Sequence, residues 1–355
     1  MKVIVCVVVL CLSFIFEASC SERGDSLVVV FWNVENFFDY FDGGTGDSDR
    51  EFSSMGARHW TKKKFYAKCD AMAKTVFWLT DRYGRMPDVI GLAEVENRGV
   101  LTKLLNHTLL RKYDYAIVHR ESGDRRGIDV GFLYNPDMFK PVGQPKGFEL
   151  KAHYADGGVV RSRLELWVSG YMLDDNRKIV MDKIHISVNH WPSRYGGEES
   201  SRATRDTAAM LCKQVCDSIY MKEPRAKIIV MGDLNDDPYN HSCAVVMGAK
   251  KTRKEVEEQG FFNTMWQKLD RGVGSLAYQG SWNLFDQIFI SEPLMNAKLE
   301  DGKWVYWKSQ IFNKPFLTVQ EGKDKGTPLR TVKSNVWQDG YADHYPTMIY
   351  LIKEK

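Results

Sequence analysis

Eight short apolar segments, spread along most of the chain, constrain the fold more than any other feature of the sequence. Each is four to seven residues long, rich in β-branched or aromatic residues, and separated from the next by polar residues. Such segments are typical of β-strands in a packed core. The segments are Leu27–Phe31, Val89–Leu92, Tyr115–Val118, Ile128–Tyr134, Leu164–Val168, Lys183–Asn189, Ile228–Met231 and Gln287–Ile290.

Two longer segments instead have the apolar spacing of helices. In Lys62–Thr80 and in Arg202–Tyr220, the apolar residues gather on one face of a helical turn pattern. Strands therefore outnumber helices and do not alternate with them strictly. This pattern predicts an α/β (α+β) fold in which sheets pack on each other and helices lie outside. We expect a single domain over residues 26–355.

Composition limits the function only loosely. The chain has 355 residues, of which 44% are hydrophobic, so it can build a large core and is unlike a disordered chain. Its formal net charge of +3 is only mildly basic, whereas proteins that hold nucleic acid by charge alone are usually more basic. Composition therefore permits an anionic substrate without arguing for one.

The first twenty residues differ from the rest of the chain. Lys2 precedes an apolar run, Val3–Phe16, and small residues precede Cys20. This order is typical of a secretory signal, and the run is too short to span a bilayer permanently. A buried first strand is the alternative, but Leu27–Phe31 already fills that position. We expect a signal peptide over residues 1–20 and an extracytoplasmic protein, which is secreted, periplasmic or anchored at the cell envelope through a lipid on Cys20.

Six groups of acidic, amide or imidazole side chains lie directly beside apolar segments. Taken singly, each group is explained by the preference of Asp and Asn for turns and helix caps. Six together are harder to explain in this way, because loops at one edge of a sheet are where functional sites are built. The groups are Asn33 with Glu35, Glu94 with Glu96, Asn189 with His190, residues 232–237, Asp286, and Asp343 with His344.

These groups lie within seven segments that resemble, in the same order, the signature blocks of the endonuclease/exonuclease/phosphatase superfamily. That superfamily includes deoxyribonuclease I, abasic-site endonucleases, secreted sphingomyelinases and inositol-polyphosphate phosphatases. The resemblance implies a four-layer αββα sandwich, with two mixed sheets face to face and helices outside, and a bacterial secreted or lipoprotein member. The segments are residues 31–36, 87–96, 127–134, 188–194, 232–236, 281–286 and 343–346.

The chemistry of such enzymes explains a group of oxygen ligands. Phosphodiester hydrolysis needs neutralised charge on the phosphoryl oxygens, a positioned water and help for the leaving oxygen. Mg²⁺ takes oxygen ligands and keeps several waters, so one or two carboxylates and an amide suffice, and Mn²⁺ is an alternative. By resemblance, Glu94 is the principal metal ligand, Asn33 is the amide beside it, and Asp343 is a ligand or a close neighbour. Glu96 matches no ligand and is interpreted as a supporting residue.

The resemblance also assigns catalytic roles. Asp233 and Asn235 match an Asp-x-Asn pair that positions the attacking water and the phosphate, and alternate residues of an extended segment point the same way. His190 and His344 match the two histidines of such sites. An imidazole titrates near neutrality, so it can both hydrogen-bond a phosphate oxygen and exchange a proton with it.

Two further carboxylates are expected to orient these histidines. Asp286 resembles the carboxylate that orients His344, as acid–histidine pairs do elsewhere. By the same logic Asp129 is expected to orient His190, although Asp129 could merely begin a strand.

Three side chains are candidates for substrate binding. Arg161 aligns with a basic residue that binds phosphate in some relatives, and Arg163, two residues further on, could fill that role instead. Arg194 follows the His190 block and would extend the anion-binding surface. Trp282 could stack on a substrate, or could simply pack within the protein.

We therefore expect a metal-dependent phosphoesterase, and nucleic acid is the leading substrate because residues 32–39 and 190–193 resemble bacterial members described as nucleases. One alternative is a sphingomyelinase-like enzyme acting on phospholipid, for which residues 37–41 are the nearest candidate for membrane contact. Another is a phosphatase of phosphorylated small molecules such as inositol or sugar phosphates. A binding module with a decayed site would predict loss of Glu94, Asp233 or His344, and all three are present.

Overall fold

The computed structural model describes residues 26–353, apart from residues 45, 81–83, 155, 174–178, 279 and 298–302. The predicted signal peptide over residues 1–20, with Cys20, lies outside the described residues. Among the helices that the structure describes, none is both long and apolar enough to cross a membrane.

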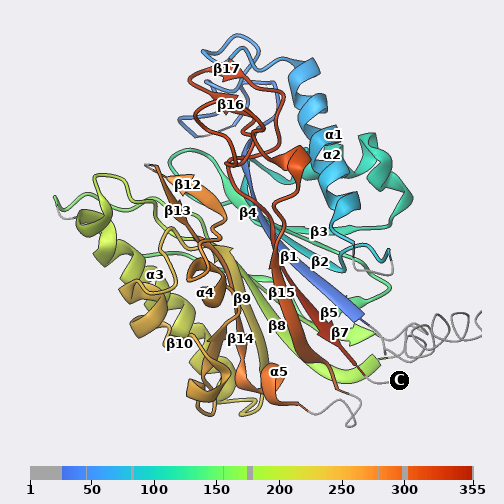
Figure 1. The fold of residues 1–355 in the computed structure, drawn as a ribbon, viewed down its shortest axis with the longest axis vertical. Coiled ribbons are helices and arrows are strands. Elements are labelled where there is room, and N and C mark those ends of the chain that lie inside the picture. The colour runs from blue at the N-terminus through green and yellow to red at the C-terminus, as the bar shows by residue number, and fades with distance from the viewer. Residues whose placement is uncertain are drawn as a thin grey trace, which may run out of the picture.

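The described chain forms four layers, with two sheets face to face and helices on both outer sides (Figure 1). The helices α1 (Lys62–Trp78) and α2 (Arg98–His107) cover one sheet, and α3 (Glu198–Tyr220) covers the other. Two short helices, α4 (Trp266–Leu269) and α5 (Glu292–Asn296), lie at the second sheet. The predicted αββα sandwich in a single domain is confirmed.

The first sheet has six strands and joins the two ends of the described chain. Its central strand β1 pairs in parallel with β2 and antiparallel with β18, the last strand. The first and last strands therefore belong to one folding unit. In spatial order the strands are β15 (Val305–Ile311), β18 (Thr347–Ile352), β1 (Ser26–Phe37), β2 (Val89–Val95), β4 (Asp129–Tyr134) and β3 (Ala116–His119).

The second sheet contains a parallel pair, β8 and β9, in which His190 lies in register with Asp233. The carboxyl ends of these two strands therefore lie side by side. In spatial order the strands are β10 (Ala249–Lys250), β11 (Phe261–Asn263), β14 (Asp286–Ser291), β9 (Lys227–Asp233), β8 (Ile179–His190), β7 (Glu165–Leu173) and β5 (Phe139–Pro141), with β6 (Lys146–Phe148) also on β7. Two small hairpins are β12 (Leu276–Tyr278) with β13 (Ser281–Asn283), and β16 (Val332–Lys333) with β17 (Val336–Trp337).

The core between the sheets is built from alternate residues of each strand. In β8, Ile184, Ile186 and Val188 are buried in the same apolar cluster as residues of β1 and β2. The two sheets approach closely at Gly91, where an added Cβ would lie 2.6 Å from the Cε of Met231. This close approach brings the carboxyl ends of β1 and β2 near those of β8 and β9.

Loops from distant parts of the chain form an upper lobe above this edge of the sandwich (Figure 1). We use this name for residues 38–61 and 313–343. Within the first segment, the Trp60 indole N–H donates to the carbonyl of Phe38. The Trp60 ring also lies 5.4 Å from that of Trp337, and this contact links the two segments. The lobe places Arg330 over the end of β1, where it contacts Glu35.

Candidate active site

Two bulges at the same level of the first sheet shape one wall of the candidate site. The pairing of β1 with β2 is interrupted between Asn33 and Phe37, and that of β2 with β4 between Ala93 and Val95. Within these interruptions Asn36 has a φ of 51° and Glu94 a φ of 63°. Left-handed conformations of this kind cost about 1–3 kcal/mol per residue, and bulges re-aim side chains at functional sites. Here the Asn36 N–H donates to the Glu94 carboxylate at 2.8 Å.

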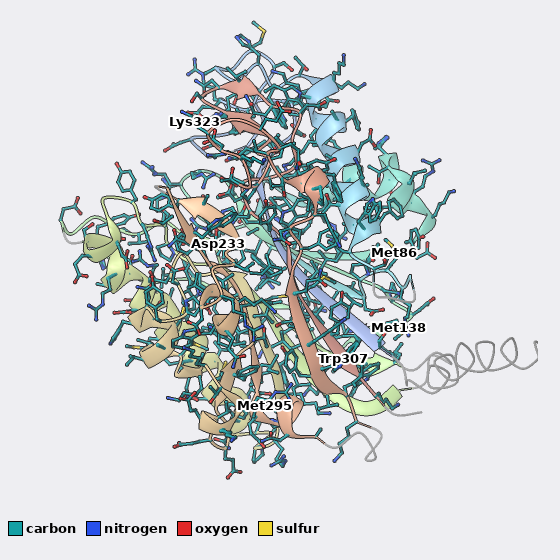
Figure 2. All side chains as sticks on the ribbon, in the orientation of Figure 1. Met86, Met138, Asp233, Met295, Trp307 and Lys323 are labelled. Carbon is teal, nitrogen blue, oxygen red and sulfur yellow. The ribbon has the colours of Figure 1, made fainter. Side chains whose placement is uncertain are left out.

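The carboxylate of Asp233 lies at the centre of the site, at the end of β9, and Figure 2 labels it. Asn33 donates from Nδ2 to Asp233 Oδ2 at 2.9 Å, and the backbone N–H of Asn235 donates to Oδ1 at 3.0 Å. His190 Nε2 and His344 Nε2 lie 3.7 and 3.9 Å from the same Oδ2. Residues from β1, β8, β9 and the segment before β18 therefore meet at one oxygen.

His344 is held by the contact predicted for it. Its Nδ1 lies 2.6 Å from Asp286 Oδ2, and the hydroxyl of Ser275 donates to that same oxygen. Burial alone would lower the pKa of His344, but the carboxylates of Asp286, Asp343 and Asp233 outweigh burial and raise that pKa well above its ordinary value. His344 is therefore protonated at neutral pH and presents an N–H at Nε2.

His190, in contrast to His344, is neutral. Burial, with the nearby Arg163 guanidinium as a second cause, lowers the pKa of His190 well below its ordinary value. Its Nδ1 is buried and has no hydrogen-bond partner among the described residues. One neutral and one protonated imidazole thus flank Asp233, and environments that push paired groups apart in this way are typical of acid–base sites.

The prediction that Asp129 orients His190 is wrong. Asp129 Oδ2 lies 3.2 Å from His119 Nε2, and Oδ1 accepts a hydrogen bond from Ser122. The reason is topological, since Asp129 begins β4 beside β3 in the first sheet, whereas His190 ends β8 in the second.

The Asp233 carboxyl is itself perturbed. Burial, together with the neighbouring Asp286 carboxylate, raises the pKa of Asp233 to about 6. A carboxylate whose pKa approaches neutrality is a better proton acceptor than an ordinary aspartate.

Two arginines at the site were not predicted from the sequence. Arg126 donates through both terminal nitrogens to the Glu94 carboxylate, at 3.1 Å each. Burial alone would raise the pKa of Glu94, but Arg126, together with His190 and the Asn36 N–H, outweighs burial and keeps that pKa well below its ordinary range. Arg330, from the upper lobe, lies 2.9 Å from Asp343 and 3.2 Å from Glu35. Arg126 directly precedes the 127–134 block, which could have drawn attention to it, whereas no motif surrounds Arg330.

The donor set fits a hard divalent cation. Glu94 is ionised, Asp343 adds a second carboxylate, and Asn33 adds an amide on the same edge of the first sheet. Another cluster, Asp233 with Asp286 and His344, brings its ligand atoms within 4.8 Å of one another. That cluster fits a cation less well, because His344 is protonated and already bonded to Asp286.

Arg161 and Trp282, two of the three predicted substrate-binding residues, are accessible. Arg161 is exposed and donates to the carbonyl of Gly123, at 3.3 Å. Trp282 is 38% exposed and stacks on Tyr345, next to His344, with 6.1 Å between ring centroids.

Arg163 and Arg194 bind within the protein instead. Arg163 is buried and donates to Asp124 and to the carbonyls of His190 and Trp191. The prediction that Arg194 binds substrate is corrected, because its side chain is only 8% exposed. The Arg194 guanidinium forms ion pairs with acidic residues of the turn after β9 and of α3, namely Asp236, Asp237 and Glu198.

A groove of about 560 Å³ has Arg126 and Arg163 among its lining residues. Its lining includes Arg125 and Arg161 and the rings of Tyr154 and Tyr195. The Tyr195 side chain is strongly exposed. The groove therefore combines arginines and aromatic side chains with the carboxylates of Asp124 and Asp156.

Comparisons with known proteins identify one family and several solved structures with the same fold. A model of the Endonuclease/Exonuclease/phosphatase family matches residues 28–353. No curated protein matches the chain significantly. The chain has the fold of truncated TDP2 from Caenorhabditis elegans, with 16% identity, 94% of this chain and 100% of that one covered, and a TM-score of 0.51.

Two further solved structures share this fold. The human Nocturnin catalytic domain with a bound sulfate is 12% identical, with 93% and 96% of the two chains covered and a TM-score of 0.53. A mannosyl-6-phosphatase from Bacteroides thetaiotaomicron is 14% identical, with 92% and 99% covered and a TM-score of 0.52. At these identities the likeness concerns the fold alone.

Proposed function

The chain belongs to the endonuclease/exonuclease/phosphatase family of phosphoesterases, and from this premise we propose that it is a metal-dependent nuclease that hydrolyses phosphodiester bonds of nucleic acid. The observation that carries the proposal is the meeting of His190, His344 and Asp233 at one oxygen, with distances of 3.7 and 3.9 Å from the two imidazoles. Side chains so placed can act together on one phosphoryl group.

The side chains divide the proton transfers between them. Asp233, oriented by Asn33 and by the Asn235 N–H, accepts a proton from the attacking water. Protonated His344, oriented by Asp286, donates from Nε2 to the oxygen on which negative charge develops. His190 is neutral and contributes an N–H to a second phosphoryl oxygen.

Asn33, Glu94 and Asp343 would hold a divalent cation, which we propose is Mg²⁺ or Mn²⁺. When bound, the cation would neutralise charge on the phosphoryl oxygens. Arg126 and Arg330 already pair with Glu94 and Asp343, so they would share these carboxylates with the cation and stay close to the substrate.

The groove beside Arg126 favours nucleic acid over a small phosphomonoester. A strand that continues beyond the reacting phosphate would bring a further phosphate to Arg125 or Arg161 and a base to Tyr195 or Tyr154. Base–aromatic stacking contributes about 1–3 kcal/mol per base in proteins that bind single strands. A sugar phosphate would leave this groove unused.

The phospholipid alternative is less well supported. Of residues 37–41, Phe37 and Phe38 are fully buried, and only Phe41 is largely exposed, at 57%. This segment therefore does not form an apolar hairpin for membrane contact. Sugar or inositol phosphates remain the second candidate, because one protein that shares the fold is a mannosyl-6-phosphatase.

The proposal is tested by offering the purified protein four substrates with Mg²⁺: plasmid DNA, single-stranded RNA, sphingomyelin and a panel of phosphomonoesters. We expect cleavage of nucleic acid, loss of activity in EDTA, and recovery with Mg²⁺ or Mn²⁺. Faster turnover of a phosphomonoester than of any nucleic acid would replace the nuclease with a phosphatase. Activity that survives exhaustive chelation would contradict the metal mechanism.

A further inference from the structure

A second cavity, of about 550 Å³, lies between α3 and the outer face of the second sheet. Residues of β6, β7 and β8 form its floor, and one face of α3 forms its opposite wall. Pockets that hold small molecules in proteins usually have volumes of about 300–1,000 Å³. The cavity is therefore large enough for a ligand of moderate size.

This cavity is separate from the active site. His185, which lines it, precedes His190 by five positions in β8, or roughly 16 Å along an extended strand. An odd separation also places the two side chains on opposite faces of the sheet. None of the residues that contact Asp233 lines the cavity.

A chain of hydrogen bonds fixes the polar side chains on the cavity floor. Ser169 and His185 lie opposite each other in the β7–β8 pair, and their Oγ and Nδ1 are 2.8 Å apart. His185 Nε2 lies 3.2 Å from Glu223, which also accepts a hydrogen bond from Lys183. Burial lowers the pKa of His185, so its imidazole is neutral at neutral pH.

Most of the charged side chains that line the cavity are positive. Its lining contains three lysines, Lys146, Lys183 and Lys222, but only one carboxylate, that of Glu223. The Glu223 carboxylate is paired with Lys183. Among the ion pairs between described residues, none involves Lys146 or Lys222, which leaves two ammonium groups available at the cavity.

Besides the uncharged polar side chains of Gln144, Gln214 and Ser218, the lining has apolar and aromatic side chains. Phe148 and Trp167 contribute from the sheet, and Leu211, Val215 and Ile219 from α3. Aromatic and aliphatic walls with a few placed polar groups are the usual composition of a small-molecule site.

We propose that this cavity is a binding site for a small organic anion with an aromatic body. The aromatic part packs against Phe148 and Trp167, and the anionic group pairs with Lys146 and Lys222. Ser169 and neutral His185 are bonded to each other, and His185 also to Glu223, so they fix the floor of the site without adding charge to it. This site is independent of the proposed nuclease activity.

The test uses two fluorescent probes that differ in charge. Anilinonaphthalene sulfonate has a fused aromatic body and a sulfonate, and phenylnaphthylamine has the same body without the sulfonate. We expect the sulfonate probe to bind the full protein with a stoichiometry of one in calorimetry. It should bind about tenfold more tightly than the neutral probe, and added salt should reduce the difference.

Matched substitutions on α3 locate the probe. Ser218→Trp would fill the cavity and abolish binding, whereas Met210→Trp, on an exposed position of the same helix that does not line the cavity, would leave it unchanged. The double variant Lys146→Gln/Lys222→Gln should weaken binding of the sulfonate probe roughly five- to tenfold. Lys213→Gln, which removes a lysine paired with Asp217 outside the cavity, is the charge control.

Thermal unfolding of each variant verifies that it is folded before binding is compared. Equal affinity for the two probes would overturn the assignment of an anion site. Unchanged binding to folded Ser218→Trp, or several weak sites in the wild type, would overturn the cavity as the binding site.

Discussion

The imidazoles of His190 and His344 flank the same carboxylate oxygen, so their contributions to catalysis should be linked. General acid–base assistance is worth about 10²–10⁴-fold, and we expect His190→Ala and His344→Ala each to lower kcat by roughly that factor. In the double variant the losses should be less than multiplicative, because both groups act on one phosphoryl group. Steady-state kinetics on an oligonucleotide measures this.

The variant Asp286→Asn tests the carboxylate that orients His344. Asp286 bonds to His344 at 2.6 Å but does not reach the proposed substrate, so Asp286→Asn should lower kcat less than His344→Ala does. Asp129→Asn, which alters a partner of His119 away from the site, is the matched control and should retain wild-type kcat. A kcat close to wild type in either histidine variant would remove that histidine from the mechanism.

Glu94→Gln should abolish hydrolysis and weaken Mg²⁺ binding in calorimetry, because an amide is a poorer ligand than a carboxylate for a hard cation. Glu96→Gln is the matched control from the same strand end. Burial raises the pKa of Glu96 to about 7, and its carboxyl accepts from the Asp39 N–H and from Asn97 Nδ2, so the amide keeps the shape and loses one hydrogen bond, at a cost of about 0.5–1.5 kcal/mol. Wild-type turnover of Glu94→Gln at saturating Mg²⁺ would exclude Glu94 as a ligand.

Glu165 predicts a pH dependence of stability. Burial raises its pKa from 4.5 to about 8 and outweighs the opposing effect of the neighbouring Trp191 and Trp167 indoles. Between these two pH values the unfolded chain releases a proton that the folded chain retains, so this residue makes stability fall as pH rises through that window. Glu165→Gln should remove this loss and stabilise the protein at pH 7.5 by about 1–3 kcal/mol.

Thermal unfolding at two pH values measures the effect of Glu165. The Tm of Glu165→Gln should exceed that of the wild type at pH 7.5, and the difference should shrink at pH 5. An equal difference at both pH values would mean that the effect is one of packing and not of ionisation.

At this scale the sequence was informative where a polar residue directly follows an apolar run. Asp233, His190 and Asp286 lie at strand ends and His344 lies just before β18, and a strand end fixes where a side chain lies. It was uninformative where the partner comes from a distant segment. Arg330 reaches Asp343 and Glu35 only because the upper lobe folds over β1, and no local pattern encodes that contact.

Among the elements, α3 supports the catalytic turn after β9. Arg205 is fully buried in α3 and lies 2.7 Å from Asp236, three residues beyond Asp233. Breaking a buried ion pair by removing one partner typically costs about 3–5 kcal/mol. Arg205→Met should therefore lower the free energy of unfolding by roughly this amount, and also kcat, because the turn loses its anchor.

Arg202→Met is the control for this element, since Arg202 lies on the same helix with a side chain that is 44% exposed. Chemical denaturation should show little change for this variant. If Arg205→Met were as stable and as active as Arg202→Met, the buried pair would not hold the turn.

The helices α1 and α3 and eight strands were predictable from their apolar residues, whereas β15, β18 and the helix α2 were not among the predicted elements. In addition, α3 begins at Glu198 and not at Arg202, and α1 ends at Trp78 and not at Thr80. Strands of two residues such as β10, β16 and β17 carry no periodicity and depend on tertiary contacts. The bulges at Asn36 and Glu94 were also beyond prediction, since non-glycine residues with positive φ have no clear sequence signal.

For the whole molecule, the apolar run Val3–Phe16 predicts export. In its native host the protein should be found outside the cytoplasm, with its N-terminus at or near Cys20 by mass spectrometry. A diacylglyceryl adduct on Cys20 would establish lipid anchoring. A soluble cytoplasmic protein that retains Met1 would contradict export.

The pairing of β1 with β18 affects when this protein becomes active during its synthesis. Asn33 lies in the first described strand and His344 lies just before the last, so a nascent chain lacks Asp343 and His344 for most of its elongation. Neither the first sheet nor the site can be completed until β18 has been made and has inserted between β1 and β15. The activity proposed for this phosphoesterase therefore requires that the first and last described strands have paired.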